Sequence, residues 1–91
     1  MKHDDFRTLI AAGVVDRVIL HRRNANDDAY ELWAFGGDNW PSHLGNRLKV
    51  QRPDHRVHRP PERTWVNVGT AIEWIRGMGW TGTIEVEEPQ P

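Results

Sequence analysis

The stretch VVDRVILHRRNANDDAYELWAF, residues 14–35, has the composition of two strands joined by a turn. Its first part is rich in β-branched residues, which favour extended backbone. The NANDD cluster that follows consists of turn formers, whose side chains hydrogen-bond to the nearby backbone. In the last part, alternate residues point to opposite faces of a strand: Tyr30, Leu32 and Ala34 to one, Glu31, Trp33 and Phe35 to the other. Together these features predict a β-hairpin.

A short helix is predicted before the hairpin. Asp4 or Asp5 is placed to cap a helix through FRTLIAA, residues 6–12. Gly13 is placed to end it, since glycine readily adopts the left-handed conformation at a helix C-terminus.

A second helix is predicted near the C-terminal end of the sequence. Asn67 is a good N-cap for VGTAIEWIRGM, residues 68–78, and Gly79 is placed after it as a stop. Apolar residues recur at helical spacing on one side of this segment, which indicates a buried stripe: Val68, Ala71, Ile72 and Ile75.

Three more segments have strand patterns. RLKVQR, residues 47–52, alternates apolar and polar residues, RTWV, residues 63–66, is a short candidate, and TGTIEVEE, residues 81–88, places Ile84 and Val86 opposite its glutamates. Strands framed by helices favour the α+β class, with an antiparallel sheet of about four strands and helices on one face. The expected order is α-β-β-β-(β)-α-β, in one domain of residues 1–88 with a flexible tail at 89–91.

Composition narrows the class of protein. The chain has 91 residues, a formal net charge of −1, five tryptophans and no cysteine, so disulfides and thiolate metal sites are excluded. Its first residues lack a long apolar run, and no segment has the roughly 20 apolar residues of a membrane span. We therefore expect a soluble cytoplasmic protein without membrane association.

Neither metal binding nor catalysis is favoured by the motifs. His55 and His58 are three residues apart, but the neighbouring prolines oppose a helix, and Arg56 and Arg59 would surround a cation with like charge. The chain has no HExxH, GxSxG, phosphate-loop or dinucleotide-binding pattern. We expect no metal, no cofactor and no catalytic residue.

The charge is concentrated in one segment. Residues 47–64 carry six basic residues against two acidic ones, whereas the segments on both sides are acidic. The six are Arg47, Lys49, Arg52, Arg56, Arg59 and Arg63. Arginine presents a rigid fork of donors that fits carboxylate or phosphate oxygens. Three interpretations remain open: a solvated loop that protects a sheet edge, a contact for an acidic protein surface, and a contact for nucleic acid.

Trp40 is a second candidate for contact with a partner. It lies in GDNWPSH, residues 37–43, a loop by its glycine, asparagine and proline content. An exposed tryptophan in such a loop can anchor an interface, and a loop tryptophan can equally fold back as a lid on the core.

The sequence from Arg63 to Glu88, less than a third of the chain, resembles the ending of small accessory proteins on plasmids and other bacterial mobile elements. The residues that carry the resemblance are Arg63, Trp65, Ala71, Ile75, Gly79, Trp80 and Gly82. It implies a non-enzymatic role in partition, stability or regulation, with protein or DNA as partner. With the basic segment, this predicts an accessory protein that binds an acidic protein surface; a DNA-associated protein is the alternative. The oligomeric state is left open.

Overall fold

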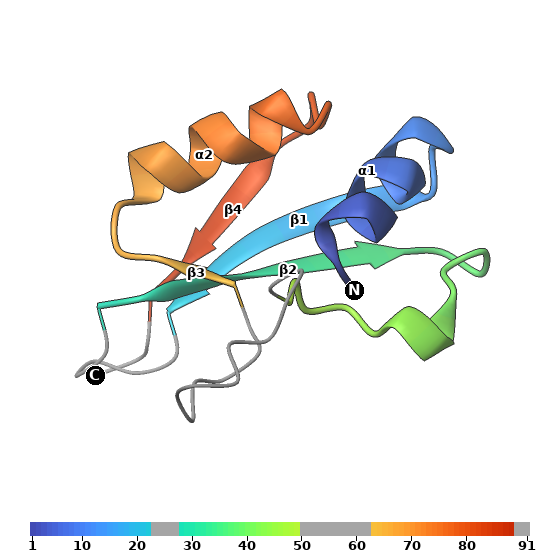
Figure 1. Ribbon diagram of the computed structural model, residues 1–91, viewed down its shortest axis with the longest axis horizontal. Coiled ribbons are helices and arrows are strands. Elements are labelled where there is room, and N and C mark those ends of the chain that lie inside the picture. Colours follow the sequence, from blue (N-terminus) through green and yellow to red (C-terminus); the bar gives the residue numbers. More distant parts are fainter. Residues whose placement is uncertain (23–27, 50–62, 89–91) are drawn as a thin grey trace.

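The computed structural model describes residues 1–22, 28–49 and 63–88. Within these ranges the chain forms two helices and a four-stranded sheet (Figure 1). The elements in chain order are α1 (His3–Ala11), β1 (Val15–Arg22), β2 (Tyr30–Gly36), the 3-10 helix η1 (Ser42–Leu44), β3 (Thr64–Trp65), α2 (Val68–Gly77) and β4 (Ile84–Glu87). The predicted α+β class is confirmed.

The sheet is mixed, with the strand order β3-β2-β1-β4. β1 and β2 form the predicted antiparallel hairpin, with Leu20 opposite Leu32. The prediction of an antiparallel sheet is wrong for the last strand, because β4 pairs with β1 in parallel. The physical reason is that α2 connects β3 at one edge to β4 at the other, and a helical crossover joins strands that run in the same direction.

The predicted strand over residues 47–52 is also corrected. Leu48 donates its backbone N–H to Leu32 O at 2.9 Å, and Arg47 forms an isolated bridge with Trp33, but the described part of this segment forms no strand. The next positions along β2 are already paired with β3, which lies in the short candidate segment at residues 63–66. Two described segments therefore share one edge of β2, and each of them covers only part of that edge. Residues 50–52 lie outside the described residues.

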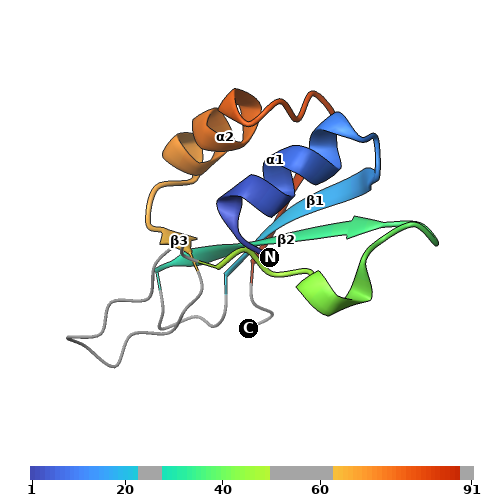
Figure 2. The ribbon, with the colours of Figure 1, turned by 45° about the vertical axis from the view of Figure 1, so that its right-hand side comes forward.

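Both helices cover the same face of the sheet, as Figures 1 and 2 show. The core lies between the helices and the sheet, and its fully buried side chains include Phe6, Val18, Leu20, Leu32, Leu48 and Ile75. The predicted stripe of α2 is confirmed at Ala71 and Ile75, which are fully buried, while Ile72 is half-buried. Neither described helix has the length or apolar composition to cross a membrane.

The helix ends agree in part with expectation. Asn67 caps α2, since its side chain accepts the backbone N–H of Thr70 at 3.1 Å. α1 begins at His3, earlier than predicted, and its N-cap is Lys2 instead of an aspartate. Asp5 acts from inside the first turn, where it accepts the backbone N–H of Lys2 at 3.0 Å. Gly13 follows α1 with a φ of 71°, in the predicted left-handed conformation.

Candidate functional site

Three of the six predicted basic residues are described, and the fold brings their backbones close together. The backbone N–H of Arg63 donates to Leu48 O at 3.0 Å, so Arg63 lies beside the segment that contains Arg47 and Lys49. The backbone N–H of Lys49 donates to Met1 O at 2.8 Å. We call the N-terminal amine of Met1 with Arg47, Lys49 and Arg63 the basic cluster. The other predicted residues, Arg52, Arg56 and Arg59, lie outside the described residues.

The N-terminal amine is bound into this region by the chain itself. It donates to Leu44 O at 2.7 Å and to Arg47 O at 3.0 Å. Its pKa is lowered, first by burial and then by the positive charges of Lys49 and Arg47, against which Asp5 acts. Sequence reasoning did not include this amine, because only the tertiary structure places it beside residues more than forty positions away.

The pKa of His3 reports the same positive field. It is lowered first by burial and then by Arg63, with Asp4 acting in the opposite direction. The His3 ring also packs edge-on against Trp74, with 5.1 Å between ring centroids. The cationic groups thus make the electrostatic potential on this side of the molecule more positive, and the aspartates of α1 partly offset this effect.

The two described arginines of the basic cluster are held by tryptophan rings. The guanidinium of Arg47 lies 5.5 Å from the centroid of Trp33, and that of Arg63 lies 5.2 Å from the centroid of Trp65. Lys49 is exposed. Stacked arginines lose less side-chain freedom when they bind a partner, which lowers the entropic cost of association.

Trp40 folds back against the protein. Its ring packs at the margin of the core, half-buried, and its Nε1–H donates to Gly45 O at 3.1 Å. These contacts favour the lid interpretation. Its role as a binding anchor stays a prediction.

The face of the sheet opposite the helices carries a different set of side chains. Alternation along β1, β2 and β4 places Ile19, Trp33 and Glu85 side by side, because Ile19 is paired with both of the others. We call this the open sheet face, since both described helices lie on the other side (Figure 2). The sequence indicated only that Trp33 points away from Leu32. The strand order is what assembles the face.

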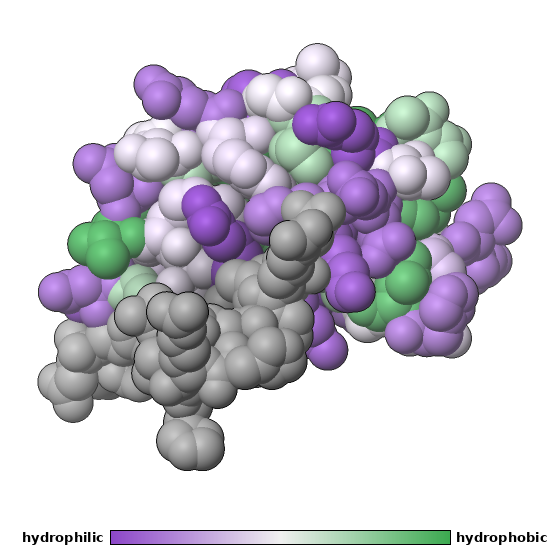
Figure 3. All heavy atoms as spheres, in the orientation of Figure 1, coloured by the Kyte–Doolittle hydropathy of each residue, from purple (hydrophilic) through white to green (hydrophobic). Residues whose placement is uncertain are grey.

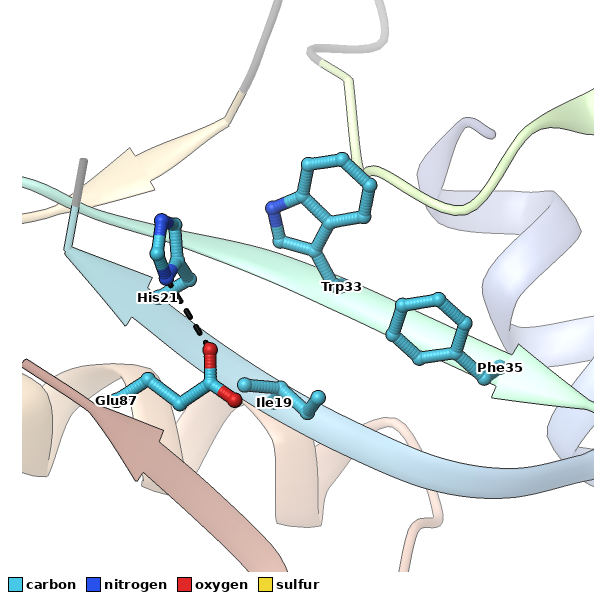
Figure 4. A pocket seen from close by; sticks show the side chains of 5 residues that line it. All are labelled: Ile19, His21, Trp33, Phe35 and Glu87. Carbon is cyan, nitrogen blue, oxygen red and sulfur yellow. Dashed lines mark ion pairs between the residues drawn. The ribbon is translucent and has the colours of Figure 1, made fainter.

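A hollow lies on the open sheet face, lined by Ile19, His21, Trp33, Phe35 and Glu87 (Figure 4). The rings of Trp33 and Phe35 are nearly parallel, at 12°, with centroids 6.2 Å apart. On the other side, His21 Nδ1 and Glu87 Oε2 are 3.3 Å apart. The hollow therefore has an aromatic wall on β2 and a carboxylate on β4, with Ile19 between them.

Ion pairs connect the remaining charges of this face. Arg17 donates from Nε to Glu85 Oε2 at 2.5 Å and from Nη2 to Oε1 at 2.9 Å, which lowers the pKa of Glu85. Arg47 Nη1 lies 3.6 Å from Oε2 of Glu31, a buried carboxylate that also accepts the Nε1–H of Trp33 at 3.0 Å. These pairs fix the side chains that surround the hollow.

The described residues contain no group of three or more histidines, cysteines, aspartates or glutamates that could hold a metal ion. His21 and Glu87 form a pair of potential ligands, which is one fewer than such a group needs. The geometry of the described surface fits binding through charge and stacking.

No protein-family model matches this chain, and no curated protein or solved structure does. The similarity of residues 63–88 to accessory proteins of mobile elements therefore stays a prediction.

Proposed function

We propose that this chain is a small non-enzymatic accessory or regulatory domain that binds an acidic surface of another protein through its basic cluster. The observation that carries the proposal is that the N-terminal amine and the backbones of Arg47, Lys49 and Arg63 come together at one edge of the fold. Stacking on Trp33 and Trp65 orients the two guanidinium groups. That of Arg47 lies on the open sheet face beside Glu31, and that of Arg63 lies by Trp65 on the side of the helices, so Lys49 and Arg63 carry most of the proposed contact.

A protein partner fits this surface better than a nucleic acid does. The aspartates of α1 lie close enough to act on the same groups as the cations: Asp5 opposes the lowering of the pKa of the Met1 amine, and Asp4 opposes that of His3. The chain as a whole carries a net charge of −1. The phosphates of a nucleic acid form a continuous line of negative charge, so some of them would lie near these carboxylates and be repelled. An acidic patch on a folded protein is smaller and can contact the cations alone.

The proposed setting is a bacterial mobile element, such as a plasmid, phage or integrated element. The resemblance carried by Arg63, Trp65 and Trp80 supports it. Neighbouring genes provide the check: phage or anti-defence genes agree with a protein partner, while partition or replication genes favour the DNA-associated alternative.

The two alternatives are separated by a salt titration. The probes are a short acidic peptide and a duplex DNA of random sequence, each followed by fluorescence anisotropy. We expect the peptide to bind, and we expect no measurable DNA binding even at low salt. DNA binding would show a slope of log K against log salt of about −0.9 for each phosphate contacted.

Charge reversal locates the contact. Lys49→Glu should weaken peptide binding, and Arg7→Glu, which changes an exposed arginine of α1 outside the basic cluster, is the matched control. Changing Arg52, Arg56 and Arg59 together to alanine tests the rest of the basic segment. Tight DNA binding that this triple change abolishes would replace the protein partner with DNA. Equal effects of Lys49→Glu and Arg7→Glu would contradict the basic cluster as the contact.

A further inference from the structure

The hollow on the open sheet face combines stacked rings with a carboxylate. Trp33 and Phe35 form its aromatic wall, and Glu87 stands across Ile19 from them (Figure 4). Ile19 is only 6% exposed, and the Glu87 side chain is 48% exposed. An apolar floor between aromatic faces and an accessible anionic group suits a long side chain with an aliphatic stem and a cationic head.

The same face already holds arginines in this manner. The guanidinium of Arg47 lies over Trp33 and beside the Glu31 carboxylate. Arg17, which is opposite Phe35 in the β1–β2 pairing, bonds to Glu85 with two nitrogens. Each of these arginines comes from this chain and lies next to an aromatic residue of β2 and a glutamate. The hollow offers the same combination with Glu87 as the glutamate.

We propose that the hollow is a second binding site, which takes an arginine side chain from an extended basic segment of a protein partner. Arg47 lies over Trp33, so the guanidinium would use Phe35 and the part of Trp33 that lines the hollow, and it would pair with Glu87 while its stem lies on Ile19. Arginine suits this site better than lysine, because its planar group stacks on rings and donates in a fork to a carboxylate.

Charge and access support a basic occupant. On the open sheet face Glu85 pairs with Arg17 and Glu31 with Arg47. Glu87 has His21 as its ion-pair partner among the described residues, so its carboxylate is the one that is not bound to an arginine there. Glu88 lies toward the other face, where it is bound by Tyr30 and Arg22. β4 is an edge strand of the sheet, and no further described strand covers its outer side. The site therefore has the opposite sign to the basic cluster, and its partner segment differs from the acidic surface proposed above.

His21 lies beside the carboxylate of Glu87 at the rim of the hollow. Its Nδ1 contacts one oxygen of Glu87, Oε2, at 3.3 Å. In Figure 4 the other oxygen lies on the side of Ile19, toward the hollow. One oxygen thus lies beside His21, and the other faces the place that the guanidinium would occupy.

The test uses the whole chain and three pentapeptides. Gly-Val-Arg-Val-Gly is compared with peptides that carry citrulline or lysine at the centre, citrulline being the uncharged analogue of arginine with nearly the same shape. Two-dimensional NMR of labelled protein follows the indole N–H of Trp33 and the backbone of Ile19 and Phe35. We expect saturable shifts with the arginine peptide, with affinity about three- to tenfold higher than for the citrulline peptide and intermediate for lysine.

Variants identify the groups that bind. Glu87→Gln keeps the shape of the side chain and should weaken arginine binding about two- to fivefold, whereas Glu88→Gln, one residue on, should leave it unchanged. Phe35→Leu removes one ring face while it preserves an apolar residue, and should also weaken binding. Lys49→Glu should have no effect, which separates this site from the basic cluster.

Three results would overturn the proposal. The first is equal binding of the arginine and citrulline peptides, and the second is unchanged binding in Glu87→Gln. The third is the lack of saturable shifts at Trp33, Ile19 and Phe35 with the arginine peptide.

Discussion

The tryptophans of this protein differ in their surroundings: some pack in the core, and Trp33 lies on the open sheet face. Trp74 packs against Phe6, with ring planes only 6° apart, and against Trp65 at a centroid distance of 5.2 Å. Trp65 is buried in the core. Trp33 lies on the open sheet face, where it is half-buried beneath Arg47. Which ring supports the fold and which is available to a partner depends on the face of the sheet it occupies.

Gly36 and Gly37 are neighbours with different steric surroundings, which gives a prediction. A Cβ at Gly36 would lie 2.3 Å from Val14 O and 2.8 Å from Trp40 Cε3, closer than atoms can approach. Gly36→Ala should therefore lower the free energy of unfolding by about 1–3 kcal/mol, because the end of β2 must shift. At Gly37 the nearest atom to an added Cβ would be 3.6 Å away, so Gly37→Ala should change the free energy of unfolding by less than about 0.5 kcal/mol.

Urea denaturation of both variants measures the difference. Equal losses would show that Val14 O and Trp40 do not limit the side chain at Gly36.

At the scale of the elements, α2 follows its sequence pattern closely. The helix begins after the predicted cap Asn67, and its buried residues Ala71 and Ile75 are four positions apart on one side. β4 follows the pattern less closely: Ile84 packs against the core, but Val86 is 43% exposed. A helix that covers a sheet buries a stripe along its length, whereas a strand at the edge of the sheet extends past what the helices cover.

The depth of burial along α2 predicts unequal effects of truncation. Ile75 is fully buried, so Ile75→Ala should lower the free energy of unfolding by about 2–5 kcal/mol through lost contacts and a cavity. Ile72 is half-buried, and Ile72→Ala should cost less. Thermal or urea unfolding of the two variants provides the comparison. A neutral Ile75→Ala would mean that a different face of α2 packs on the sheet.

At the scale of the whole molecule, the sheet separates two kinds of surface. The covered face holds the core, and the open sheet face holds paired charges with the aromatic hollow between them. In the view of Figure 3, polar residues cover most of the described surface and apolar ones form small separate patches. The basic cluster and the hollow, which we propose as contact surfaces, would thus bind groups of opposite charge.

Acid should destabilise this arrangement, because carboxylates on and next to β4 are bound by groups of β1 and β2. Hydrogen bonds from Arg17 lower the pKa of Glu85 from its ordinary value of 4.5, and a hydrogen bond from Tyr30 together with Arg22 lowers that of Glu88. The folded-state pKa lies below the unfolded one, so the unfolded chain binds protons more readily. This contribution to stability is present above about pH 4.5 and is lost as the pH falls through the lower folded-state pKa.

Thermal unfolding as a function of pH provides the measurement. Glu85→Gln should be less stable than the unmodified chain near neutral pH, and the difference should shrink as the pH falls below about 4.5. In an Arg17→Gln background the same change should have no such pH dependence. A difference that stays constant into acid would show that the Arg17–Glu85 pair contributes nothing to folding.

The sequence by itself determined the local structure. The hairpin, the cap at Asn67, the stripe of α2 and the alternation of β2 follow from backbone preferences and from the periodicity of apolar residues, which act over a few positions. The basic residues of the segment 47–63 were recognisable for the same reason, since they are neighbours in the chain.

Only the tertiary structure decided how these parts meet. The parallel pairing of β4 with β1, the sharing of β2 between two segments, and the position of the Met1 amine beside Arg47 all join residues far apart in the chain. The hollow likewise needs Trp33, Ile19 and Glu87 from three strands. Contacts of this kind depend on the free energy of packing the whole chain. β4 pairs with β1 because α2, which precedes β4, must cross the sheet to cover the core. No local pattern of residues specifies that partner.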